Sequence, residues 1–487
     1  MEIKRKFYRF YKWQYFWLFL IVLSTLILHF SIITQIDHPF FDEIHYVGDA
    51  RRIIVDNTTA RLEHPPLGKL FVVAGEYIFS GFKSPKTDTG TTLQQPVTDR
   101  TVTVIDVSDA SVFRTGKTIR IDAEHMEIVS INTSLNQITV KRGTDSTAAT
   151  SHAAEQAIYV FDDNPWCWRV FPIILGTATI VTFYFLCRRF NMSPAAANIA
   201  AFLLAFENLT FVQASVAMLD VFYLTFMMAA FLLYACRKYI LSGIAIGLSG
   251  LAKLTGLLAL PAIGIHWIFS RQPRSWWFLL LILFAIISFV ELMIVFDFTI
   301  TREFSSVWDP IHRIKEMESL SGSLTFATVT HPAASHPWDW VWWLSYKPMA
   351  YWVMPHYTGA ISFTIWAMII PTFIYMLVRA IKGSEAALFG VSWFASTYLI
   401  WIPATLITDR VSYIFYFYST IGSICLGLGM ALSQLLDYFH NGRITWLRRA
   451  LLIIFIVFIA AHLISFIILS PIVPYDFGQL IGITPRY

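Results

Sequence analysis

Charged residues are scarce in this 487-residue chain: they make up 14% of it, against about 25% in ordinary soluble domains. Hydrophobic residues account for 56%, and Phe (41 residues) and Trp (17 residues) are abundant. The surface of an ordinary soluble globular protein needs more charge than this, so that class is excluded. The composition predicts a polytopic membrane protein.

Cysteine is also scarce, and the four cysteines lie in or beside apolar segments with neither metal-ligand nor paired spacing. We interpret them as packing residues that say nothing about the redox compartment: Cys167, Cys187, Cys236 and Cys425. A continuous basic face is missing too, because Lys and Arg occur mainly in pairs at the ends of apolar runs. This pattern excludes a nucleic-acid partner.

The chain begins MEIKRKFYRFYKWQ and then enters an apolar run without a small-residue cleavage site, so we expect a retained first span. Crossing a bilayer takes about 20 apolar residues. On that measure we place eleven spans, near 14–34, 169–187, 194–214, 218–236, 239–252, 254–270, 276–298, 359–379, 386–407, 411–435 and 448–470. The fifth and sixth can also be read as one long kinked pair around Lys253.

Basic residues follow every second predicted span, which places those ends and the N-terminus in the cytoplasm. The clusters are Arg188-Arg189, Arg237-Lys238, Arg271 and Arg274, Arg379 and Lys382, and Arg443, Arg448 and Arg449. Other ionisable residues map to the opposite, extracytoplasmic end: Asp42, Glu43, His64, Lys69, Arg169, Glu207, Asp220, Lys253, His336 and Arg410. Charge at membrane depth is costly, so this gathering predicts one polar chamber on the outer face; ion pairs that tie helices together are the alternative.

The stretch 37–79 combines an adjacent acid pair, Asp42-Glu43, with several basic groups and a His-Pro-Pro turn. Hydrolysis of a glycoside needs both an acid and a base. Transfer from a sugar-phosphate lipid needs only a base, provided that cations offset the charge of the leaving phosphate. Lys69, Arg169, Lys253 and Arg410 are available for that task, whereas Asp220 is interpreted as a helix N-cap. The inventory favours sugar transfer, with an ion-coupled transporter as the rival.

The long loop between the first two spans changes character at residues 84–160, where short alternating runs predict half-buried strands. These runs lie at 101–107, 117–122, 126–131 and 136–142. We therefore predict an inserted β domain, which resembles a small β-barrel module of phage-tail and bacterial surface proteins. Its Asp122, Glu124 and His125 form either a metal or catalytic cluster or, the reading we prefer, solvated polar groups at strand edges.

The second large loop, 301–357, contains a Trp cluster of Trp338, Trp340, Trp342 and Trp343. It is interpreted either as an interfacial aromatic belt or as a lid over the chamber.

Several motifs resemble those of protein O-mannosyltransferases, which have the GT-C membrane glycosyltransferase fold. They are FDEIHY (41–46), HPPLGK (64–69), the Arg169 segment, 205–220, 247–256, SHPWDW (335–340) and Arg410 with the Tyr-rich run 413–418. The resemblance implies an all-α polytopic membrane protein of about 11 transmembrane helices. The domains expected are 1–83 (first span, catalytic loop and surface helix), 84–160 (the β domain) and 161–487 (the remaining helices).

The resemblance also implies the reaction: mannose passes with inversion from a polyprenyl-phosphate carrier to Ser or Thr hydroxyls of an extracytoplasmic protein. Asp42 would be the base and Glu43 would hold the acceptor or sugar. The groups at the donor phosphate would be Arg169, Lys253, Lys69, His64 and Arg410, and those at the acceptor or lid His336, Trp338 and Trp340. No cofactor is required by that mechanism, and dependence on a divalent metal is left undecided.

The loop 301–357 has no room for the trefoil-like β domain of eukaryotic members, so the resemblance implies a prokaryotic plasma-membrane protein, with a dimer left open. The alternatives are a GT-C transferase that moves aminoarabinose or arabinose to lipid or polysaccharide, and a membrane transporter. Transporters often carry inverted repeats, and this sequence shows no clear repeat. For the insert we hypothesise recruitment of the acceptor.

Overall fold

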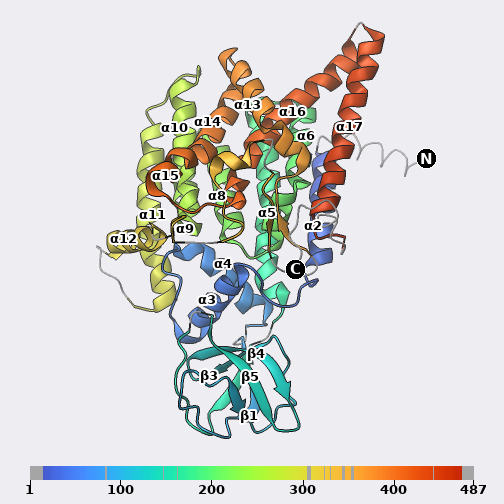
Figure 1. Ribbon diagram of the computed structural model, residues 1–487. Coiled ribbons are helices and arrows are strands. Elements are labelled where there is room, and N and C mark those ends of the chain that lie inside the picture. The colour runs from blue at the N-terminus through green and yellow to red at the C-terminus, as the bar shows by residue number, and fades with distance from the viewer. Residues whose placement is uncertain are drawn as a thin grey trace, which may run out of the picture.

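The computed structural model describes residues 15–82, 85–145, 147–161, 163–303, 309–322, 324–328, 331–342, 346–351, 356–442 and 444–473. It is a bundle of apolar helices with a small β domain attached at one end (Figure 1). The first part contributes α2 (Phe16–Ile32), α3 (Glu43–Asp56) and α4 (Pro66–Phe79). The bundle continues with α5 (Pro165–Arg189), α6 (Pro194–Ala205), α7 (Asn208–Ser215), α8 (Leu219–Ala235), α9 (Tyr239–Ala252), η1 (Leu254–Leu258), α10 (Ala259–Phe269) and α11 (Phe278–Thr301).

The second half begins with α12 (Asp309–Gly322), which belongs to the loop between α11 and α13. The remaining helical elements are η2 (Pro337–Trp340), α13 (Phe363–Ile381), α14 (Glu385–Phe394), η3 (Ala395–Leu399), α15 (Trp401–Thr408), η4 (Ile414–Phe417), α16 (Tyr418–Asn441) and α17 (Thr445–Leu469). Two short strands, β7 (Met349–Ala350) and β8 (Thr358–Gly359), pair before α13.

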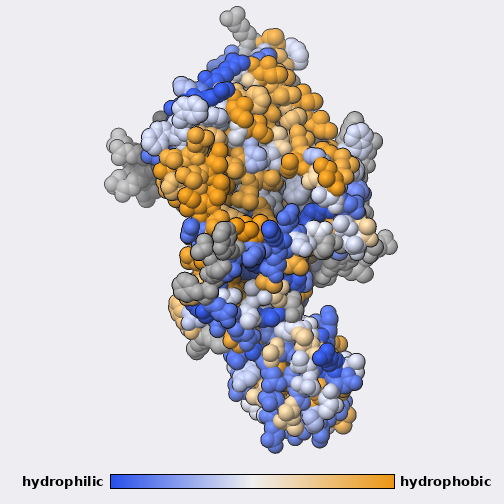
Figure 2. Space-filling model, turned by 90° about the vertical axis from the view of Figure 1, so that its left-hand side faces the viewer, coloured by the Kyte–Doolittle hydropathy of each residue, from blue (hydrophilic) through white to orange (hydrophobic). Residues whose placement is uncertain are grey.

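Every segment predicted as a span coincides with helical structure. By length and apolar composition, six helices of the described residues can cross a membrane, or seven with the bent pair α6–α7. Four shorter apolar helical segments occupy the other predicted positions: Phe16–Ile32, Leu219–Ala235, Tyr239–Ala252 and Leu254–Phe269. Figure 2 shows the apolar side chains gathered over the bundle and the hydrophilic ones over the β domain. The chain is therefore an integral membrane protein.

The pair α6–α7 bends by 59° at Glu207, and buried polar groups satisfy the broken backbone there. One oxygen of Glu207 accepts a hydrogen bond from the Thr210 amide (2.7 Å), and the other accepts one from the Ser362 amide (2.8 Å). The Asn208 side-chain amide donates to the carbonyls of Thr358 (2.8 Å) and Ala360 (3.0 Å). Glu207 and Asn208 are thus structural groups that tie the bend to the segment before α13.

Contacts bring the basic clusters together at the ends of α5, α8, α10 and α13. Arg189 donates to the Ala235 carbonyl (3.3 Å), Arg237 to Gln272 (3.3 Å) and Arg271 to the Ile381 carbonyl (2.9 Å). The N-terminal cluster and Arg443 lie outside the described residues.

The inserted domain is a six-stranded antiparallel sheet in the order β1-β6-β3-β4-β5-β2. The strands are β1 (Lys86–Thr92), β2 (Val104–Asp106), β3 (Thr118–Ile121), β4 (Glu124–Asn132), β5 (Gln137–Thr144) and β6 (Ala157–Phe161). The four alternating runs contain β2, β3, most of β4 and most of β5, so these strands are confirmed. Their inward residues form a separate apolar core that includes Ile119, Met126 and Val140.

Ion pairs fix the β domain to α3. Arg120 donates to both carboxylate oxygens of Asp56 (3.0 and 2.7 Å). Asp163, just after β6, accepts from Arg51 of α3 (2.8 Å) and pairs with Lys117 of the insert (3.2 Å), which links the two parts. Helix α4, which begins after Pro65, lies between the bundle and the sheet (Figure 1). The domain that follows α4 in sequence is thereby held beneath the loop that carries Asp42.

Candidate active site

A buried ion pair organises the start of α3. Arg169, near the start of α5, donates from Nε (3.0 Å) and Nη2 (2.8 Å) to the two carboxylate oxygens of Glu43, and neither side chain is exposed. Its remaining donors reach the carbonyls of Ile33 (2.9 Å), Ile36 (2.6 Å) and His38 (3.1 Å). Since a guanidinium has five N–H groups, this arrangement occupies all of them.

This pair corrects two predicted roles. Arg169 has no donor left for a lipid phosphate and instead holds the chain between α2 and α3. Glu43 also accepts a hydrogen bond from the Ala217 amide (2.8 Å), so its carboxylate is enclosed and does not face an acceptor or a sugar. Both residues position the loop that carries Asp42.

Asp42 differs from its neighbour Glu43 in the exposure and in the hydrogen bonding of its side chain. Its side chain is half-buried, and among the described residues no group makes a hydrogen bond or an ion pair with the Asp42 carboxylate. The pKa of Asp42 is raised to about 6: burial is the main cause and the charge of Asp220 adds to it, whereas the charges of Lys253 and Arg61 act in the opposite direction. A partly accessible carboxylate with a pKa near neutrality can accept a proton from a hydroxyl.

Lys253 lies at the break between α9 and η1, where it pairs with Asp220 in the first turn of α8. Its Nζ donates to both oxygens of Asp220 (2.9 and 2.8 Å) and lies 5.4 Å from the ring centre of Phe415 and 5.8 Å from that of Tyr416. An ammonium group has three N–H donors, so one remains for a ligand. The prediction that Asp220 is an N-cap is wrong, because Met218 takes that position and makes no side-chain cap.

His64 completes the cluster from the turn before α4. Its Nε2 lies 3.4 Å from the Tyr46 hydroxyl. Burial lowers the pKa of His64 well below its usual value, and the charges of Lys253, Lys69, Arg61 and Arg410 lower it further. The ring is therefore neutral in a site rich in positive charge, and Arg410 lies close enough to contribute to that charge.

Lys69 is not available to a substrate. Its side chain has no exposed surface; Nζ donates to the Thr59 hydroxyl (2.7 Å) and the Arg61 carbonyl and lies 3.4 Å from Asp49. The predicted contact with a donor phosphate is therefore corrected: Lys69 fixes the backbone that carries Arg61.

The loop that carries the Trp cluster has a buried part and an exposed part. Trp340 is buried and its Nε1 donates to the Ser335 hydroxyl (2.9 Å), which excludes it from a mobile lid surface. His336 lies between the rings of Phe326 (4.1 Å) and Trp338 (4.5 Å), and Trp338 is 39% exposed. Trp343 lies outside the described residues, so the choice between belt and lid stays open for the exposed part.

The sequence interpretation missed Arg313 of α12, which supports the same turn as His64. Its guanidinium donates to the carbonyls of Leu62 and His64 and pairs with Glu316 (2.9 Å). Neither spacing nor hydropathy points to it, since α12 is polar and lies in a different loop.

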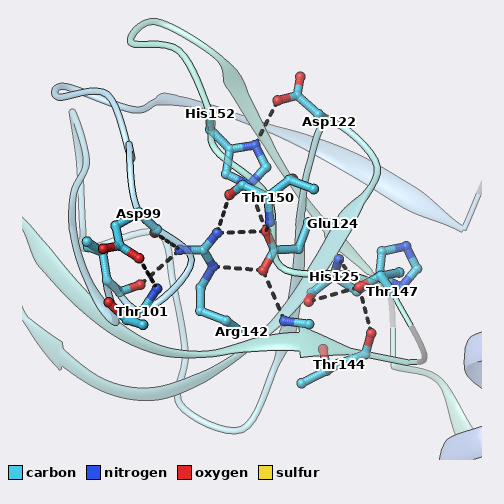
Figure 3. A network of polar contacts seen from close by, with 12 residues as sticks. Asp99, Thr101, Asp122, Glu124, His125, Arg142, Thr144, Thr147, Thr150 and His152 are labelled. Carbon is cyan, nitrogen blue, oxygen red and sulfur yellow. Dashed lines mark hydrogen bonds and ion pairs between the residues drawn. The ribbon is translucent and has the colours of Figure 1, made fainter.

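The polar residues of the insert form a closed network and not a second active site (Figure 3). The Glu124 carboxylate accepts hydrogen bonds from Arg142 (2.7 and 2.8 Å) and from the amides of Gly143 (3.0 Å) and Thr150 (2.9 Å). The ring of His152 lies 2.9 Å from Glu124 and 2.8 Å from Asp122. Burial would raise the pKa of Glu124, but these hydrogen bonds lower it to about 2.

Glu124 and His125 are therefore buried, which corrects their interpretation as solvated edge groups. Among the residues that the structure describes, no group of three or more His, Cys, Asp or Glu side chains is arranged to hold a metal ion.

The reassignment of Lys69 predicts a specific pattern of stability and binding. Lys69→Met leaves the Asp49 charge buried without its cation, which should lower the free energy of unfolding by about 3–5 kcal/mol. Adding Asp49→Asn should restore most of that loss, as measured by thermal unfolding in detergent. For a polyprenyl-phosphate-sugar lipid titrated into the same preparations, the Kd should be equal in the double variant and the wild type; a tenfold weaker Kd would instead support direct contact of Lys69 with the phosphate.

Comparison with known proteins gives one family match and several structural neighbours. Residues 149–307 match the family described as dolichyl-phosphate-mannose-protein mannosyltransferase. The structure of the S. cerevisiae protein O-mannosyltransferase Pmt1-Pmt2 complex bound to the sugar donor aligns with a TM-score of 0.62 at 12% identity, over 94% of this chain and 90% of that chain. Comparison with curated protein sequences yields no match.

Two further solved structures align more loosely. The oligosaccharyltransferase of Archaeoglobus fulgidus has a TM-score of 0.46 at 12% identity, over 93% of this chain and 55% of that chain. ArnT from Cupriavidus metallidurans has a TM-score of 0.45 at 15% identity, over 96% of this chain and 75% of that chain. With the family match and the Pmt1-Pmt2 fold in hand, the resemblance that the motifs indicate is confirmed: the chain is a membrane glycosyltransferase of the GT-C fold that resembles the protein O-mannosyltransferases.

Proposed function

We propose that this chain transfers mannose from a polyprenyl-phosphate carrier to Ser or Thr hydroxyls of extracytoplasmic proteins, with inversion at the sugar carbon. The observation that carries the proposal is the Asp42 carboxylate, which has a raised pKa and no partner among the described residues, in a cluster with the Lys253–Asp220 pair. One base and nearby cations are what sugar transfer from a lipid phosphate requires.

In the proposed reaction Asp42 takes the proton of the acceptor hydroxyl. The hydroxyl oxygen attacks the anomeric carbon from the face opposite the phosphate and forms the new glycosidic bond. The bond between that carbon and the phosphate oxygen breaks, and its electron pair leaves with the polyprenyl phosphate. The free N–H of Lys253 then stabilises the charge that develops on the phosphate, with Arg410 adding to the positive potential.

The surrounding groups act by position. Glu43 and Arg169 hold Asp42 in place, while the neutral His64 ring can form a hydrogen bond with a sugar hydroxyl. These steps use no metal ion. The proposal places the chamber on the extracytoplasmic side of a prokaryotic plasma membrane and the N-terminus in the cytoplasm; the yeast neighbour is a Pmt1-Pmt2 complex, and a dimer of this chain stays a prediction.

The direct test offers the purified full-length chain polyprenyl-phosphate-[14C]mannose and a Ser/Thr-rich peptide. Label should appear on the peptide and not on a matched peptide in which Ala replaces Ser and Thr. Transfer of aminoarabinose or arabinose from the corresponding lipid phosphates, without mannose transfer, would contradict the sugar. Labelling of lipid or polysaccharide but not peptide would contradict the acceptor.

The loss of activity at low pH, the acid limb of the pH profile, should report the protonation of Asp42. Because only the ionised carboxylate accepts a proton, kcat/KM should rise with pH around the Asp42 pKa of about 6. Asp220→Asn removes a negative charge, which lowers this pKa and moves the limb to lower pH by about one unit. Lys253→Gln removes a positive charge and should move the limb to higher pH.

The matched control is Glu318→Gln, an exposed charge change on α12 that should leave the limb in place. A limb that stays fixed in both the Asp220 and the Lys253 variants would contradict titration of Asp42.

A further inference from the structure

A cleft of about 640 Å³ lies between the β domain and the start of α3. Its lining comes from both parts of the protein and includes Phe41, His45, Arg61, Thr118, Glu127 and Lys141. We propose that this cleft binds the acceptor as an extended polypeptide segment whose Ser or Thr hydroxyl reaches Asp42. The inference rests on the proposed function, for which it supplies the acceptor site.

One wall is a polar row across three strands of the insert. Thr118 of β3 is the register partner of Glu127 in β4, and Glu127 is the register partner of Lys141 in β5. The next residues along two of these strands, Ile119 in β3 and Val140 in β5, point the other way and are buried in the core of the domain. Within the described residues the side chains of this row form no hydrogen bonds or ion pairs, so their polar groups are available to a ligand.

The facing wall carries apolar side chains together with His45 and Arg61. Phe40, Phe41 and Ile44 line it, so residues on both sides of Asp42 in the chain contribute to it. The Phe41 ring stacks on Tyr351 with a centroid distance of 4.1 Å and an interplanar angle of 4°. A segment bound in the cleft therefore passes beside the loop that carries Asp42.

The distance between the walls is fixed by the fold. The Glu124 carboxylate of Figure 3 accepts hydrogen bonds from the amides of Gly143, near the end of β5, and Thr150, and Asp145, directly after β5, lies against the face of α3. There Asp145 lies so close to Gly48 that an added Cβ would meet its side chain at 2.7 Å. The ring of His125 lies 3.1 Å from the same carboxylate. These contacts tie the polar wall of the insert to the face of α3.

The chemistry of the cleft favours a polypeptide over other acceptors. In an extended segment successive side chains point to opposite sides, so one set meets the polar row and the other meets the mixed facing wall, with its apolar side chains and its basic groups. Glu127 and Lys141 offer charges of both signs for main-chain and side-chain groups. A lipid acceptor would approach from the bundle, on the other side of α3 and α4 (Figure 1).

The kinetic test compares Thr118→Trp, which fills the cleft, and Lys141→Glu, which reverses one charge, in the full-length enzyme. Each should raise KM for the peptide about tenfold, the loss of roughly 1.4 kcal/mol of binding, with kcat and donor KM unchanged. The controls are Leu135→Trp and Thr133→Glu in the exposed β4–β5 turn, which should match the wild type. Unchanged peptide KM in both cleft variants would overturn the proposal.

A binding test separates this inference from the proposed reaction. Thr118→Cys, in a Cys236→Ser background because the other native cysteines are buried, is incubated with a bromoacetyl-bearing Ser/Thr-rich peptide. Capture at Thr118→Cys but not at Leu135→Cys would support the cleft. If this capture occurs but the enzyme transfers no mannose, the proposed reaction is refuted and the cleft is retained. Mannose transfer with equal capture at both positions, or suppression of capture by a polysaccharide but not by an unlabelled peptide, would overturn the cleft proposal.

Discussion

The buried pair of Glu43 and Arg169 is the interaction on which the loop that carries Asp42 depends. Two charges with no exposed surface are stable only when their hydrogen bonds are satisfied, and here the guanidinium uses all its donors. The pair joins α5 to the first turn of α3, and the other donors of Arg169 hold the segment between α2 and α3. It therefore fixes Asp42, the residue directly before Glu43, without touching the Asp42 carboxylate. Of the two adjacent acids, Glu43 is structural and Asp42 is the base that we propose.

A second buried contact sets the electrostatics of the site. Lys253 and Asp220 lie at the ends of neighbouring apolar helices, and their opposite charges act on Asp42 in opposite directions. Because Asp220 occupies two N–H donors of Lys253, the lysine is held in one orientation and its third N–H donor remains for a ligand. The same logic recurs at Lys69 and Arg313, which fix backbone beside the chamber. Much of the charge at this end of the bundle thus builds the cavity, and a smaller part of it remains for substrate.

The sequence predicted features that depend on local pattern and missed those that depend on distant partners. Apolar length located the helical segments, and alternation located strands such as β3 and β5, because both signals repeat along the chain. Asp42 could be singled out because it is a polar residue in a motif beside a span. The roles of Glu43, Arg169 and Asp220 were misassigned, since nothing in their local sequence names a partner far along the chain. Arg313 carries no signal at all, because its function is to hold two carbonyl groups of another loop.

The most direct measurement compares turnover and thermal unfolding of Asp42→Asn and Glu43→Gln, side by side with the wild type. The two substitutions remove the same charge from adjacent residues, so each serves as the control for the other. The account predicts that Asp42→Asn retains the wild-type Tm and donor binding while its turnover falls by about 100-fold or more. Glu43→Gln should lower Tm by several degrees, because it leaves Arg169 buried without its counter-charge. A stable Glu43→Gln protein without turnover, beside an Asp42→Asn protein that still transfers sugar, would contradict the assignment of the base.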